Sequence, residues 1–156
     1  MRPFNIFGPR QSSRAFIPSV ISQIANGEKE IQVGDLSPTR DFTYVTDTCR
    51  AFLNVSESDN AIGRTFNIGT NTEYSMEDIL YKIKNLMNSD ISINSDKSRL
   101  RPKESEVYRL KCDNSLIKNT IGFEPSYELD KGLEETIEWF KNPLNLRHYK
   151  TNIYNI

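Results

Sequence analysis

Short apolar segments that end at a glycine alternate along this chain with longer segments whose apolar residues recur at helical spacing. Residues 4–7, 31–33 and 65–68 have the length and the branched or aromatic content of strands, and a glycine follows each of them. Helical spacing covers residues 18–25, between the first two of these strands, and residues 76–86, after the last of them. The alternation predicts an α/β fold of short strands and amphipathic helices in one domain.

Local sequence marks predict where several helices begin and which face they bury. Ser75 and Asp78 have the spacing of a capping box, and Asp130 is predicted to cap the last helix. For a helix expected from Thr46, the stripe predicted to be buried consists of Cys49, Phe52 and Leu53.

The charge balance and the apolar runs exclude several classes of partner. The chain has 20 Lys and Arg against 21 Asp and Glu, whereas proteins that bind nucleic acid through its phosphates need a basic surplus. No run reaches the ~18 apolar residues of a membrane span, and the N-terminal stretch lacks the apolar core of a signal peptide. We therefore expect no nucleic-acid partner, no membrane partner and a cytoplasmic location.

Cysteine and histidine are too few for several kinds of chemistry. Cys49 and Cys112 make neither a disulfide framework nor a zinc site, and both are predicted to be reduced and buried. The single histidine, His148, excludes a histidine metal cluster, so no metal site is predicted.

Three polar clusters interrupt the pattern, and each allows a functional and a structural interpretation. Asn5 ends a strand before the loop 8–14. In the functional interpretation, its amide meets a ligand at the sheet edge. In the structural interpretation, the loop is simply solvated by its arginines. In the run 99–106, basic residues precede acidic ones. In the functional interpretation, the acids accept hydrogen bonds from ribose hydroxyls. In the structural interpretation, the run is a solvated charged segment.

The remaining cluster, residues 35–47, has Arg40 at its centre. Arginine is shaped for two-point contact with phosphate, so an Arg40 that points into a cleft would bind that group. The alternative is a surface ion pair with Asp41 or Asp47, worth ~0–1 kcal/mol.

Five motifs stand in order along the chain: residues 2–11, 40–47, 66–69, 101–102, and 122–125 with 132–139. Together they resemble the C-terminal half of extended short-chain dehydrogenase/reductase enzymes, which are NAD-dependent nucleotide-sugar epimerases, 4,6-dehydratases and decarboxylases. Residues 8–18 are most similar to bacterial and archaeal sugar-nucleotide 4,6-dehydratases, with 4-epimerases close behind.

The resemblance implies a Rossmann-type α/β enzyme of which residues 1–141 are the substrate-binding domain and 142–156 a C-terminal tail. It implies that Asn5 hydrogen-bonds the substrate near its sugar and diphosphate, and that Arg40 and Arg101 clamp the diphosphate. The other residues for which it implies a place at the substrate are Phe16, Ile17, Asn67 and Glu104, the last as acceptor from the nucleotide ribose.

Two parts of the family pattern are missing from this sequence: the Gly-x-x-Gly-x-x-Gly turn that holds the dinucleotide and the catalytic Tyr-x-x-x-Lys. Tyr127 and Lys131 have the second spacing, but Pro125 and the predicted cap at Asp130 interrupt the required helix, so we interpret the match as accidental. The resemblance therefore implies a truncated or excised chain without its N-terminal cofactor-binding half. NAD is expected in the complete enzyme and is not expected to bind this chain alone, which has no catalytic residue of its own.

These expectations describe the nucleotide-sugar-binding part of an NAD-dependent 4,6-dehydratase or 4-epimerase, inactive alone. Its expected partners are a nucleotide diphosphate sugar and either the missing half or further copies of itself. Two alternatives stay open: a non-catalytic module that binds nucleotide sugars, and a truncated fragment that self-associates.

Overall fold

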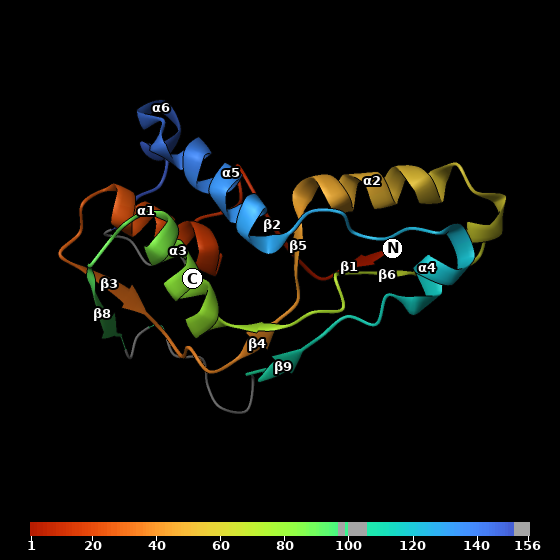
Figure 1. Cartoon of the computed structure of the whole chain (residues 1–156), viewed down its shortest axis with the longest axis horizontal. Helices are drawn as coiled ribbons and strands as arrows, with labels where there is room; N and C mark the ends of the chain where they lie inside the picture. The colour runs from red at the N-terminus through yellow and green to blue at the C-terminus, as the bar shows by residue number, and fades with distance from the viewer. Residues whose placement is uncertain (97–98, 100–105, 152–156) are drawn as a thin grey trace.

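Strands of two to four residues form the frame of the fold, and helices cover them (Figure 1). The computed structural model describes residues 1–96, 99 and 106–151. Three pairs of strands are parallel: β1 (Arg2–Pro3) with β6 (Asn67–Ile68), β2 (Asn5–Phe7) with β5 (Phe42–Tyr44), and β3 (Glu30–Val33) with β8 (Ser92–Ser95). In a further sheet, β4 (Thr39–Arg40) lies between antiparallel β7 (Tyr74–Ser75) and parallel β9 (Arg109–Leu110).

The helices follow the strands in the predicted alternation, which confirms the α/β fold. They are α1 (Phe16–Ala25), α2 (Val45–Ser56), α3 (Met76–Leu86), α4 (Ser115–Ile121), α5 (Leu129–Lys141) and α6 (Pro143–Leu146), with a 3-10 turn, η1, at Asp59–Ala61. Within the predicted tail, α6 is followed by Tyr149, whose ring packs on Phe140 and whose hydroxyl donates to the Gln11 carbonyl oxygen at 2.8 Å.

The two predicted helix caps have different outcomes. The capping box is confirmed, because the Asp78 N–H donates to Ser75 Oγ and the Ser75 N–H donates to Asp78 Oδ2, both at 3.0 Å. The cap at Asp130 is wrong: α5 begins at Leu129, and Glu128 is the cap residue. Asp130 lies in the first turn instead, where its carboxylate accepts from Lys82 Nζ at 2.7 Å.

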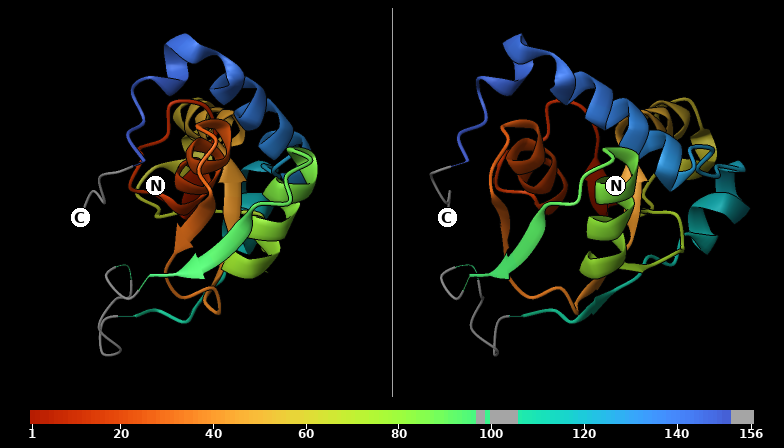
Figure 2. Two further views of the ribbon diagram at one scale, coloured as in Figure 1. Left: turned by 90° about the vertical axis from the view of Figure 1, so that its left-hand side faces the viewer. Right: turned by 60° about the vertical axis from the view of Figure 1, so that its left-hand side comes forward.

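Two groups of apolar side chains hold these elements together. The larger lies where α1, α3 and α5 contact one another over β2, β3 and β5, and Figure 2 shows α5 crossing above α1 and α3. The smaller lies at the other end of the molecule between α2, β6 and α4, and its members are Ala51, Ala61, Phe66, Ile68, Ile117 and Phe123.

The predicted buried stripe of α2 is wrong. Phe52 is 47% exposed, Leu53 is 62% exposed and Cys49 is also exposed, whereas the buried residues of the helix are Asp47, Thr48 and Ala51. Helical spacing identifies an apolar face but not the neighbour that covers it, and here hydrogen bonds to Asp47 turn the opposite face inward.

The cysteines therefore differ from each other, contrary to the prediction that both are buried. Cys112 alone is buried. Burial and, to a smaller degree, the nearby Asp41 and Asp113 carboxylates raise the pKa of its thiol to about 12.

Candidate functional site

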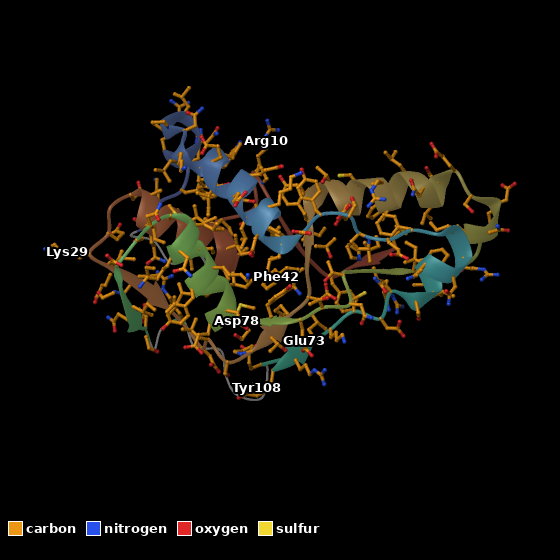
Figure 3. All side chains as sticks on the ribbon, in the orientation of Figure 1. Arg10, Lys29, Phe42, Glu73, Asp78 and Tyr108 are labelled. Carbon is orange, nitrogen blue, oxygen red and sulfur yellow. The ribbon has the colours of Figure 1, made fainter. Side chains whose placement is uncertain are left out.

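A cleft of about 380 Å³ opens beside α1, β4 and β5. Its apolar wall includes Phe42, which Figure 3 labels near the centre of the molecule, together with Phe16, Ile17, Val20, Val33, Pro38 and Met76. Its polar lining includes Asn5, Gln11, Arg14, Asp35, Arg40, Arg99 and Glu106. Four of the residues implied at a substrate by the resemblance thus lie together: Asn5, Phe16, Ile17 and Arg40.

Strand pairing brings Asn5 and Arg40 to the same cleft. In the parallel pair of β2 and β5, Asn5 lies opposite Phe42. The Asn5 side-chain N–H donates to the Asp41 carbonyl oxygen at 3.2 Å, and Arg40 immediately precedes that residue. The register of β2 on β5 therefore sets the position of Asn5 relative to Arg40.

The N-terminus of α1 opens on the same cleft. Ala15, Phe16 and Ile17 all line it. The cap residue Ala15 has no side-chain cap, and the first turn contains no acidic residue. Unsatisfied N–H groups and the positive end of the helix dipole favour an anion at such a position.

Arg40 is held by an acid from a distant part of the chain. Its Nη2 lies 2.9 Å from Glu106 Oε1, with the two side chains 13% and 11% exposed, and its Nη1 donates to the Thr39 carbonyl oxygen at 2.8 Å. The alternative of a surface ion pair with Asp41 or Asp47 is wrong, because both of those aspartates are buried and bonded elsewhere.

The strand that carries Arg40 is fastened at the surface by Glu73, which Figure 3 labels beside β4 and β9. The Glu73 carboxylate accepts from Thr39 Oγ1 at 2.7 Å and from Arg109 Nε at 2.8 Å. These hydrogen bonds, from Arg109 first and then from Thr39, lower the pKa of Glu73 from its ordinary 4.5 to about 2.

A pH dependence of stability follows from Glu73. A carboxyl whose pKa is lower in the folded protein stabilises the fold above its ordinary pKa, and that contribution disappears as the pH falls toward the folded value. We expect Glu73→Gln to lower the melting temperature at pH 7 and to reduce the loss that the wild type shows between pH 4.5 and about 2. Melting temperatures measured across this pH range test the prediction, with the exposed Glu134→Gln as control. The same dependence of melting temperature on pH in the wild type and in Glu73→Gln would contradict it.

The other residues implied by the resemblance are not brought to the described cleft. Asn67 lies on β6, where its side-chain N–H donates to the Asp113 carbonyl oxygen at 3.4 Å, and it is not among the cleft-lining residues that the structure describes. The reason is that β6 pairs with β1 and not with β2 or β5. Arg101 and Glu104 lie outside the described residues.

Within the charged run 99–106, the residues that line the cleft are Arg99 and Glu106, and neither of them was predicted as a site residue. The charge pattern identified the run 99–106, but a charge pattern does not indicate which side chains of the run reach Arg40.

Tyr127 and Lys131 do not lie on one continuous helix. Tyr127 precedes α5, its hydroxyl donates to Glu135 Oε1 at 2.6 Å, and Lys131 Nζ lies over its ring, 5.0 Å from the centroid. In residues 1–96, 99 and 106–151, no group of three or more His, Cys, Asp and Glu side chains is placed to hold a metal ion. None of the helices in the same part of the chain has the length and apolar content to cross a membrane.

Comparison with known proteins yields one family model, whose description is GDP-mannose 4,6 dehydratase and which matches residues 1–136. The chain is similar to the dTDP-glucose 4,6-dehydratase of Xanthomonas campestris, with 27% identity over 146 residues that cover 87% of this chain and 40% of the relative.

Solved structures of epimerases are also similar to this chain. An epimerase from Methanothermobacter thermautotrophicus superposes with a TM-score of 0.84 at 28% identity, over 94% of this chain and 44% of the epimerase. The UDP-glucuronic acid 4-epimerase of Bacillus cereus, solved with UDP-glucuronic acid and NAD, gives a TM-score of 0.80 at 27% identity, over 90% of this chain and 44% of the epimerase. The chain thus spans less than half the length of these relatives.

Proposed function

Because this chain belongs to the GDP-mannose 4,6-dehydratase family of NAD-dependent sugar-nucleotide enzymes, we propose that it supplies the part of such an enzyme that binds the nucleotide diphosphate sugar. The observation that carries this proposal is the convergence of Asn5, Arg40 and the N-terminus of α1 on one cleft. Guanidinium groups and helix N-termini are the groups that proteins use to bind phosphate. An uncapped helix end without an acid in its first turn adds to the positive potential there.

Glu106 is proposed to accept from a hydroxyl of the ligand. Its Oε1 pairs with Arg40, and its Oε2 has no partner among the residues that the structure describes. An ionised carboxylate accepts at both oxygens, so Oε2 can take a hydroxyl hydrogen while Oε1 holds Arg40. The resemblance assigned this role to Glu104, but Glu106 is the acid of the run 99–106 that lines the described cleft.

The chemistry of hydride transfer is proposed to depend on a cofactor-binding half that this chain does not contain. The residues present do not fit NAD: the sequence has no Gly-x-x-Gly-x-x-Gly turn, and the Tyr127 hydroxyl is held by Glu135. NAD accepts and returns a hydride when bound in a complete enzyme. The role of this chain's own residues is to bind and orient the sugar nucleotide.

The exposed face of α2 is the proposed contact surface for that half. Cys49, Phe52 and Leu53 form an apolar group on the outside of the helix, and exposed apolar groups of this kind mark interaction surfaces. Contact between two copies of this chain through the same face is the self-association alternative.

Calorimetric titration of the purified chain tests the proposal, with UDP-glucose, dTDP-glucose and GDP-mannose as ligands. We expect at least one of them to bind, and Arg40→Gln to weaken binding by about tenfold or more, since a charge-assisted hydrogen bond contributes about 1.5–3 kcal/mol. Arg64→Gln, an exposed arginine away from the cleft, is the matched control.

Two outcomes would contradict the proposal. One is the absence of binding for every nucleotide sugar, and the other is an equal loss in the Arg40 and Arg64 variants. A separate experiment, incubation of the chain with NAD and the same nucleotide sugars, tests whether the chain alone is inactive. A keto-sugar product would refute the proposal that it is.

A further inference from the structure

We propose that Tyr149 is a positioning residue for the cleft, because its hydroxyl holds the turn 8–11 in the conformation that forms part of the cleft wall. The inference rests on the proposed function, since it concerns the same cleft. Tyr149 is not among the cleft-lining residues that the structure describes, and it acts on the cleft through Gln11. It belongs to the predicted C-terminal tail, for which neither the sequence nor the resemblance implied a role.

The turn 8–11 contains backbone conformations that need support from outside. Arg10, which has a Cβ atom, has a φ of 67°, in the left-handed region that is unfavourable for such residues. Pro9 followed by a positive φ is the pattern of a type II turn, in which glycine is usual at the position of Arg10. Backbone of this kind persists only where surrounding contacts hold it.

Gln11 closes the turn and joins it to two other places in the chain. Its N–H donates to the Gly8 carbonyl oxygen at 3.3 Å, and its side-chain Nε2 donates to the Ile6 carbonyl oxygen at 2.7 Å. Its own carbonyl oxygen accepts from the Tyr149 hydroxyl at 2.8 Å, across 138 residues of sequence. Ile6 follows Asn5 on β2, and both Asn5 and Gln11 line the cleft. The hydroxyl of Tyr149 therefore ties this part of the cleft wall to the C-terminal segment.

Tyr149 is itself held in place by α5. Its ring packs on Phe140, with ring centroids 4.5 Å apart, and on Trp139, with centroids 5.9 Å apart. Its N–H donates to the Leu146 carbonyl oxygen at 2.8 Å. Phe140 is fully buried in the larger apolar group. The Tyr149 hydroxyl is thus a donor with a fixed position, and not the end of a freely moving side chain.

The C-terminal segment contacts the chain on both sides of α1, the helix whose N-terminus opens on the cleft. Tyr149 bonds to Gln11 before this helix, and the Thr151 hydroxyl donates to the Glu28 carboxylate after it. Figure 1 shows α6, from which this segment continues, at the end of α5 and above α1. These contacts give the segment a direct mechanical connection to the cleft wall.

A merely structural role and a positioning role predict different effects of removing the hydroxyl. Tyr149→Phe keeps the ring contacts with α5 and removes the hydrogen bond to Gln11. The matched control is Tyr127→Phe, which removes the bond from the Tyr127 hydroxyl to Glu135 Oε1 at 2.6 Å, away from the described cleft. If the Tyr149 hydroxyl only stabilises the fold, both variants have lower melting temperatures and neither changes the turn or the cleft.

Limited trypsin digestion of the folded chain measures the opening of the turn directly. Arg10 and Arg14 are exposed, and cleavage after them releases fragments 1–10 and 1–14, which mass spectrometry identifies. Cleavage of this kind follows the population of the open form. We expect these fragments to form about three to ten times faster from Tyr149→Phe than from the wild type, the effect of one lost hydrogen bond. Tyr127→Phe is expected to release them at the wild-type rate.

Calorimetric titration with UDP-glucose, dTDP-glucose and GDP-mannose measures the effect on the cleft. We expect Tyr149→Phe to weaken the binding of the ligand that the wild type binds by about threefold or more, because the open turn must first close again. Tyr127→Phe is expected to stay within about twofold of the wild type. Melting temperatures of all three proteins confirm that they are folded under the conditions of both measurements.

The outcomes separate this inference from the proposed function. Wild-type binding together with an unchanged cleavage rate or an unchanged affinity in Tyr149→Phe overturns the inference alone. Equal changes in Tyr149→Phe and Tyr127→Phe also overturn it, because they show a general loss of stability. Absence of wild-type binding to all three nucleotide sugars overturns the proposed function, and the inference with it.

Discussion

Replacement of Asp47 by alanine is expected to lower the free energy of unfolding by about 3 kcal/mol or more. Asp47 is 2% exposed, and its Oδ2 accepts from the Ser126 N–H at 2.9 Å and from the Tyr127 N–H at 2.8 Å. Its Oδ1 accepts from Arg50 Nη2 at 2.6 Å. Alanine would leave two backbone donors and a guanidinium without the acceptor that joins α2 to the segment before α5.

Urea denaturation of Asp47→Ala measures this effect, with Asp90→Ala, an exposed aspartate, as the control expected to change stability by less than about 0.5 kcal/mol. Burial by itself raises the pKa of Asp47, but hydrogen bonds from Arg50, Tyr127 and Ser126 lower it below its ordinary 3.8 overall. The contribution of Asp47 to the free energy of unfolding is therefore present above pH 3.8 and is lost as the pH falls below this value. Equal stability of Asp47→Ala and Asp90→Ala would refute the prediction.

Replacement of Asp41 by alanine is expected to cost about 3 kcal/mol as well, for a related reason in another place. Asp41 is fully buried. Its Oδ1 accepts from both the N–H and the hydroxyl of Thr70 at 2.8 Å, and its Oδ2 accepts from the Cys112 N–H at 3.2 Å. The carboxylate thus joins the segment between β4 and β5 to the chain after β6 and to the chain before α4.

Asp41→Asn separates the charge from the hydrogen bonds. An amide keeps one acceptor oxygen and replaces the other by a donor, which would face the donor of Thr70 or of Cys112. We expect Asp41→Asn to be destabilised by an amount between zero and that of Asp41→Ala in urea denaturation. Loss of less than about 1 kcal/mol in Asp41→Ala would show that this carboxylate is not a structural link.

Residues 40–47 illustrate what sequence reasoning misses. The sequence groups Arg40, Asp41 and Asp47 into one polar cluster, for which a cleft and a surface ion pair were the two interpretations. The structure divides the cluster, because Arg40 faces the cleft while Asp41 and Asp47 bond to segments that are distant in the sequence. Two of the three charges stabilise the fold, and only one is available to a ligand.

The sequence alone determined the α/β alternation, the capping box at Ser75 and the family, because strand ends, helix caps and motif order are local patterns. Only the tertiary structure decided that Glu106 is the partner of Arg40 and that Arg99 reaches the same cleft. Those contacts depend on the pairing of β4 with β9 and on the close approach of the chain at Arg99 to Gly34. Hydrophobic spacing and charge order describe neighbours along the chain, whereas strand register and backbone packing bring together residues that are far apart in it.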